Sequence, residues 1–161
     1  MLPKALQEIV DEMHRGSKAV LKDCEDVNPT LLLFNIKNGK VKHHEVIDAQ
    51  PFLYYGDAGK TAIVAMAGSF LQFGIIDAAV MVMNVFFAEV DDPTITPSEC
   101  VNKQEAVLYN VLTKTEQYLV MSTIIRDDDN VVTDFGDFEV RQVDPKHASG
   151  NLIREVVQPL H

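Results

Sequence analysis

The most apolar part of the chain runs from Ala62 to Ala88, where the polar side chains are Ser69, Gln72, Asp77 and Asn84. Before Gly74 this stretch is rich in Ala, Met, Leu and Phe, and after Asp77 it is rich in Val, Met and Phe. The change predicts a buried helix followed by a buried strand. Neither piece has the roughly 20 residues that a membrane span needs, and Asp77 would cost about 2.5 to 3.5 kcal/mol near mid-bilayer. We therefore expect a protein core here and no membrane segment.

Two main helices are predicted. The first begins near Pro3, which suits an opening turn, and continues to about Lys22. Its apolar residues recur at helical spacing: Leu2, Leu6, Ile9, Val10, Met13, Val20 and Leu21. The second helix is expected from Ala58 to about Phe73, capped by Asp57 and ended by Gly74. Because apolar groups surround most of the second helix, we expect it to be deeply buried.

The remaining patterns predict strands. Residues Thr30 to Ile36 and Lys40 to Ile47 flank Asn38-Gly39, a strong signal for a two-residue hairpin turn. In the second half, antiparallel strands are expected over Ala78 to Glu89, Glu105 to Leu112, Tyr118 to Arg126, and Val131 to about Val143, the last divided by Gly136.

The order of these elements, α-β-β-α-β-β-β-β, favours an α+β fold. We expect two main helices packed on one face of a mostly antiparallel sheet of about five to six strands. Residues 1–161 are predicted to form a single domain, with a partly irregular tail from about Asp144 that contains a short helix at Asn151 to Val157. The order of elements resembles the profilin, roadblock and longin topologies, which also place a hairpin between two helices before a meander. That resemblance covers topology and no motif.

Three segments carry a second resemblance: Phe86-Phe87-Ala88-Glu89, Lys103-Gln104-Glu105-Ala106-Val107, and Ile125-Arg126-Asp127 followed by an Asn-Val turn. They look like a group of functionally uncharacterised bacterial and phage proteins, over about the C-terminal half of the chain. The resemblance implies a bacterial or phage origin. It implies no activity, because the group has none to carry over.

Charge and cysteine usage exclude several functions. The formal net charge is -10, with 24 Asp and Glu against 14 Lys and Arg, whereas binding nucleic acid through phosphates needs basic patches. Acidic residues near the N-terminus interrupt the apolar region that a signal peptide needs, so a cytoplasmic location is expected. Cys24 and Cys100 lie far apart in the sequence and outside any CxxC pattern, so we expect both to be reduced thiols, as is usual in the cytosol. No cofactor is expected.

One segment, Gly56-Asp57-Ala58-Gly59-Lys60-Thr61, ends like a phosphate-binding loop. That loop also requires a glycine at the position of Tyr54. We therefore interpret the segment as an ordinary helix start.

Metal ligands can be suggested at two places. His43 and Glu45 should point to one face of a strand and His44 to the other, but zinc needs three or four ligands. The acidic loops offer oxygen ligands at Asp91, Asp127 and Asp129. The Asp127 run is no EF-hand, because Val132 and Phe138 replace the required Gly and Glu. Solvated surfaces are the alternative interpretation of both places.

Glu89, Glu105 and Arg126 form the main candidate site, because a meander brings the ends of their strands to one edge of the sheet. A turn at Thr115-Glu116 would place Glu105 directly opposite Arg126, and a turn at Lys114-Thr115 would place the two diagonally. The cluster could bind a cation or supply an acid/base pair beside an arginine. The alternative is a charged rim with a cross-strand salt bridge.

Three functional hypotheses follow. The first is a small non-enzymatic domain that binds another protein, with a second copy of itself as one candidate, through an exposed strand edge or the face of the first helix. The second is an acidic inhibitor or immunity-type protein for a basic partner. The third is an enzyme or cation-binding protein that uses the Glu89, Glu105 and Arg126 edge.

Overall fold

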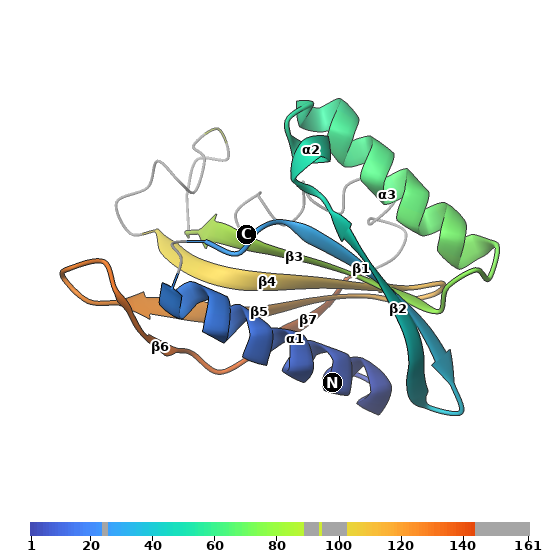
Figure 1. Ribbon diagram of the computed structural model, residues 1–161, viewed down its shortest axis with the longest axis horizontal. Coiled ribbons are helices and arrows are strands. Elements are labelled where there is room, and N and C mark those ends of the chain that lie inside the picture. Colours follow the sequence, from blue (N-terminus) through green and yellow to red (C-terminus); the bar gives the residue numbers. More distant parts are fainter. Residues whose placement is uncertain (24–25, 89–93, 95–102, 144–161) are drawn as a thin grey trace.

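The computed structural model describes residues 1–23, 26–88, 94 and 103–143, without the side chains of His43 and Asp57. Its elements in chain order are α1 (Lys4–Asp23), β1 (Thr30–Lys37), β2 (Lys40–Asp48), α2 (Gln50–Leu53), α3 (Gly56–Gln72), β3 (Ala78–Phe87), β4 (Gln104–Thr113), β5 (Gln117–Arg126), β6 (Val132–Phe135) and β7 (Glu139–Val143). Figure 1 shows a curved sheet with α1 and α3 lying apart from each other. The fold is α+β, as expected. The predicted C-terminal helix, at residues 151–157, lies outside the described residues.

The sheet has seven antiparallel strands in the order β2-β1-β3-β4-β5-β6, with β7 also paired to β5. The count exceeds the expected five to six because β6 and β7 follow one another along the same edge of β5. Gly136 lies between them: its N–H donates to the Thr123 carbonyl at 2.9 Å, and its carbonyl accepts the Ser122 hydroxyl at 2.7 Å. The predicted division at Gly136 is confirmed.

The turns follow the sequence signals. Asn38 and Gly39 have φ of 52° and 72°, both in the left-handed region that a two-residue hairpin turn requires. Between β4 and β5, the Thr113 N–H donates to the Glu116 carbonyl at 2.8 Å, so the turn residues are Lys114 and Thr115. Of the two registers that the sequence allowed, the structure has the one that places Glu105 and Arg126 diagonally.

The two long helices cover opposite faces of the sheet. Apolar residues of α1, among them Leu6 and Val10, belong to one core cluster with Val80 and Val82 of β3. Apolar residues of α3 belong to another with alternate residues of the same strand: Ile63, Ala67, Leu71, Ala79, Met81 and Met83. Successive residues of a strand point to opposite faces, so the expectation of both helices on one face is not confirmed. The apolar run from Ala78 to Met83 in β3 is typical of a strand covered on both faces.

The second long helix is less buried than its composition indicated. Ile63 and Ala67 are almost inaccessible, but Ala62 and Ala65 on the opposite side are exposed. The helix starts at Gly56, and Tyr55 precedes it without a side-chain cap, so Asp57 is not the residue before the first turn.

The end of α3 is as predicted: Gly74 has φ 69°, and the next N–H, from Ile75, donates to the Phe70 carbonyl at 2.9 Å. Within the described ranges, no helix has both the length and the apolar character to cross a membrane.

Candidate functional site

The predicted pair of Glu105 and Arg126 does form. Arg126 Nε donates to Glu105 Oε2 at 2.7 Å, and Nη2 donates to Glu105 Oε1 at 2.9 Å. Ala106 pairs with Thr123, which leaves Glu105 diagonal to Arg126 on the face that α1 covers. Bidentate geometry of this kind is the strongest form of carboxylate–guanidinium contact.

This pair belongs to a larger hydrogen-bonded network. The Asn84 amide donates to Glu105 Oε1 at 3.1 Å and to Asp26 Oδ1 at 3.0 Å, and its oxygen accepts the Val27 N–H at 3.2 Å. Arg126 Nη1 also donates to a carbonyl of the following turn, at 3.1 Å. The side chains of Glu105 and Arg126 are each only 15% exposed. The network fastens the segment after α1 to the sheet, which supports the salt-bridge interpretation over a catalytic one.

The other predicted members of that edge, Glu89 and Asp91, lie outside the described residues. Asp127 is described, and its Oδ1 accepts the N–H groups of Asp129 and Val131 at 3.0 and 2.9 Å. These bonds hold a tight turn in which Asn130 has φ 64°. The Asp127 carboxylate therefore has a structural role in the turn.

Strand β2 carries the other predicted metal ligands. In its register opposite β1, His43 pairs with Asn35 and Glu45 pairs with Leu33. Glu45 is exposed. In the part of the chain that the structure describes, no three His, Cys, Asp or Glu residues come together as a metal site.

The segment that ends like a phosphate-binding loop forms the first turn of α3. A Cβ added to Gly59 would overlap the carbonyl oxygen of Phe52 in α2. Glycine is therefore needed at this position because α2 and α3 touch there, which confirms that the segment is a helix start.

A buried histidine joins α1 to the sheet. His14 is 7% exposed, and its Nδ1 lies 2.9 Å from the Tyr109 hydroxyl in β4. Its ring contacts Phe135 and Phe138, with ring centroids 5.6 and 4.7 Å away. Burial lowers the pKa of His14 to about 4, with a smaller contribution from Lys18 in the same direction.

The tyrosine partner of that histidine is equally enclosed. Burial raises the pKa of Tyr109, although a hydrogen bond with Ser17 opposes the shift. Tyr109 is 0% exposed, so the pair contributes to packing and cannot meet a substrate in this conformation.

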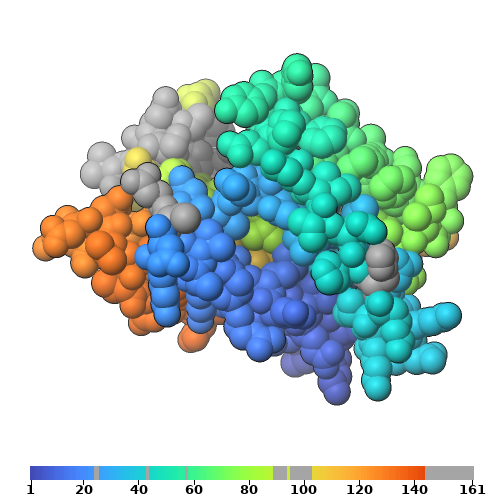
Figure 2. Space-filling model, in the orientation of Figure 1, coloured from blue at the N-terminus to red at the C-terminus, as the bar shows by residue number. Residues whose placement is uncertain are grey.

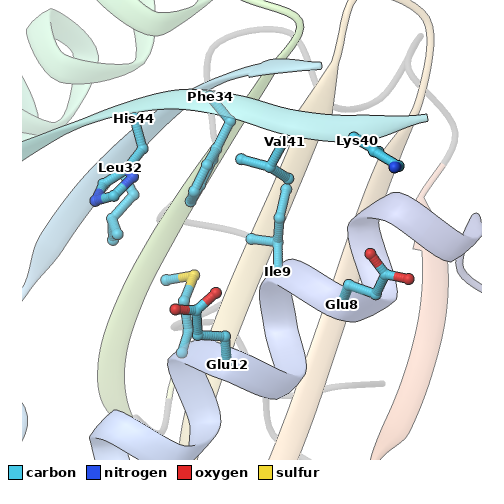
Figure 3. Close-up of a pocket in the computed structure, with 9 residues that line it drawn as sticks. Glu8, Ile9, Glu12, Leu32, Phe34, Lys40, Val41 and His44 are labelled. Atoms are coloured by element: carbon cyan, nitrogen blue, oxygen red, sulfur yellow. The ribbon is translucent and has the colours of Figure 1, made fainter. Parts of the chain in front are cut away.

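A cavity of about 350 Å³ lies between α1 and the β1–β2 hairpin, and we call it the hairpin cavity (Figure 3). Its apolar floor combines Ile9 and Met13 of α1 with Leu32 and Phe34 of β1 and Val41 of β2. Ile9 and Phe34 are nearly buried, at 4% and 5% exposure. The floor is thus a continuation of the core on the α1 face of the sheet.

Four polar side chains border this cavity. Glu8 and Glu12 stand one turn apart on α1, while Lys40 and His44 come from β2. In Figure 3, Glu8 lies near Lys40 at one end, Glu12 reaches from the helix toward the hairpin, and His44 lies at the other end. The His44 ring is tilted by 34° against the Phe34 ring, with centroids 6.0 Å apart.

The outer face of α3 carries an exposed apolar surface. Its exposed residues from Thr61 to Ser69 are small, and four large apolar residues stand at its two ends: Tyr54 (82% exposed), Tyr55 (77%), Phe73 (81%) and Ile75 (57%). No charged residue occurs from Thr61 to Ile76. Beside Tyr55, a shallow apolar groove of about 460 Å³ runs between α2 and the start of α3. Figure 2 shows α3 in green along the upper right border of the molecule.

Sequence reasoning found neither the hairpin cavity nor the exposed face of α3. The sequence does show Glu8 and Glu12 one helical turn apart beside Ile9 and Met13, and it shows a strand pattern around His44. What brings them together is the contact between α1 and β2, which no local pattern reveals.

No family model, curated protein or solved structure matches this chain.

Proposed function

We propose that the protein is a protein-binding domain that associates with a second copy of itself through the outer face of α3. The observation that carries this proposal is the uncharged stretch from Thr61 to Ile76, which makes up most of α3 and its end, with Tyr54 and Tyr55 exposed before the helix and Phe73 and Ile75 exposed after it. Exposed apolar patches rimmed by polar residues mark interaction sites on soluble proteins.

The surfaces that the sequence suggested are less suitable. The solvent side of α1 mixes both signs of charge, with Lys4, Asp11 and Arg15 exposed. The edge strand β2 carries exposed Lys42 and Glu45, and charges of this kind on an edge oppose pairing with another strand. The mixed charges on α1 also argue against one continuous acidic face for a basic partner.

A second copy fits the α3 face because the face is self-complementary. A two-fold axis near Ala65 would set the two helices antiparallel, so that the tyrosines of one protomer meet Phe73 and Ile75 of the other. Exposed Ala62 and Ala65 leave room for the helix axes to approach closely. Because each protomer carries a net charge of -10, an uncharged contact face is the arrangement that avoids like-charge repulsion.

The area is also adequate. An aromatic side chain buries about 150 to 250 Å², so three aromatics that are about four-fifths exposed offer roughly 500 Å² per protomer. Ile75 and the small residues of the helix bring the total near the roughly 800 Å² per partner of a standard interface.

Sedimentation equilibrium of the wild-type protein and of Ala65→Glu tests the proposal. We expect a dimer for the wild type at concentrations of about 10 to 100 μM and a monomer for the variant, because a buried unpaired carboxylate at the axis would cost several kcal/mol. Ala19→Glu is the matched control: it adds the same charge at an exposed alanine of α1 and should leave the dimer intact. A monomeric wild type, or an Ala65→Glu variant that remains dimeric, would refute the proposal.

A further inference from the structure

We propose that the hairpin cavity is a binding site for a small organic cation, an ammonium group on an apolar body. This site lies on the α1 face of the sheet and is independent of self-association through α3.

The size and floor of the cavity suit such a ligand. Its volume of about 350 Å³ falls at the lower end of the roughly 300 to 1,000 Å³ typical of small-molecule sites. The Phe34 ring and the Ile9 side chain line its floor. An aromatic or branched aliphatic body would replace water over these groups and bury apolar surface.

The charges around the cavity select a cation. Glu8 and Glu12 contribute two negative charges against the single positive charge of Lys40. Glu8 already lies 4.0 Å from Lys4. Among the described residues, Glu12 forms no hydrogen bond or ion pair, although its carboxylate reaches toward the hairpin in Figure 3. Glu12 is therefore the acceptor available to an ammonium group.

Two further features favour a positively charged ligand. The face of the Phe34 ring is electron-rich and attracts a cation within about 6 Å of its centroid. The net charge of -10 on the whole chain also raises the local concentration of cations over that of anions. Lys40 lies at the Glu8 end of the cavity (Figure 3).

The test uses three probes of similar shape: phenethylammonium, neutral 2-phenylethanol and anionic 3-phenylpropionate. Each is titrated into ¹⁵N-labelled protein, and two-dimensional NMR spectra report shifts at Ile9, Met13 and Val41. We expect phenethylammonium to bind with a dissociation constant on the order of 1 mM. The alcohol should bind about fivefold more weakly and the carboxylate more weakly still. Shifts that do not saturate for the ammonium probe, or equal binding of the carboxylate, would overturn the proposal.

Matched variants locate the contact. Glu12→Gln keeps the shape of the side chain and should weaken phenethylammonium binding about fivefold without changing binding of the alcohol. Asp11→Asn removes the same charge from the neighbouring helix position, outside the cavity, and should change binding by less than about twofold. Val41→Trp should fill the floor and abolish the shifts from all three probes, while the dispersion of the spectrum shows that the chain remains folded. If Glu12→Gln and Asp11→Asn behave alike, or if the Val41→Trp variant still binds, the cavity is not the site.

Discussion

The buried His14 makes the stability of the protein depend on pH in a predictable direction. In the unfolded chain a histidine takes up its proton near its ordinary pKa of about 6.5, whereas in the folded protein burial lowers the pKa of His14 to about 4. Between these values the unfolded state binds more protons than the folded state, so the free energy of unfolding falls as the pH falls. The contribution of His14 is fully present above about pH 6.5 and is lost as the pH approaches 4.

The size of the effect follows from the shift. Each pKa unit corresponds to about 1.4 kcal/mol, so a shift of about 2.5 units amounts to roughly 3 kcal/mol in total. Between about pH 7.5 and about pH 4.5, His14 alone should remove about 2.5 kcal/mol from the free energy of unfolding. A loss of this size is a large part of the free energy of unfolding of a typical domain, which is roughly 5 to 15 kcal/mol.

Urea unfolding at both pH values, followed by circular dichroism, measures the loss. Carboxylates titrate in the same range, so the wild type must be compared with His14→Phe, which keeps the ring contacts with Phe135 and Phe138 but cannot be protonated. The variant leaves Ser17 in place as a polar neighbour of the Tyr109 hydroxyl. The variant should lose about 2.5 kcal/mol less than the wild type over the interval. Equal losses, or an NMR titration of His14 with a midpoint near pH 6.5, would refute the reasoning.

Two further pairs of substitutions test the packing by urea unfolding. Glu105→Gln should lower the free energy of unfolding by about 2 kcal/mol, because it leaves Arg126 half-buried without its bidentate partner. Glu139→Gln, in a pair whose side chains are 45% and 61% exposed, should change it by less than about 0.5 kcal/mol. Gly59→Ala should cost at least about 2 kcal/mol, since its Cβ would overlap a backbone carbonyl of α2, whereas Gly16→Ala, in open space within α1, should add about 0.5 to 1 kcal/mol. If the two members of either pair give equal changes, the corresponding contact does not contribute as described.

Local chemistry explains why most elements could be predicted from the sequence. The hairpin turn at Asn38-Gly39 and the end of α3 at Gly74 each require a left-handed backbone. Asn and Gly adopt this conformation most readily, so both features could be predicted from these residues alone. The proximity of Glu105 and Arg126 was also predictable, because consecutive strands in a meander have few alternative registers. The turn at Lys114-Thr115 then selected one of the two registers.

Features that depend on contacts between distant segments could not be predicted in the same way. The side of the sheet on which each helix packs depends on how the chain connects the helix to its neighbouring strands. The sequence of a central strand such as β3 does not reveal that side, because the strand is apolar on both faces. The exposed face of α3 could not be predicted from the sequence, because alanines such as Ala62 and Ala65 occur in both buried and exposed positions. The hairpin cavity could not be predicted for a related reason, since Glu12 and His44 come to border one cavity only after α1 has packed against the sheet.

The aromatic surroundings of His14 have a consequence for the order of assembly. The helix that carries His14 is synthesised before the rings that enclose it, which are Tyr109 in β4, Phe135 in β6 and Phe138 just before β7. Closing that contact joins His14 and Tyr109, which are 95 positions apart in the chain. Contacts so distant in sequence form late and slow the folding of a domain. During synthesis the part of α1 around His14 therefore stays without its aromatic partners until Phe138 has emerged, and apolar surface exposed in that interval favours misassociation.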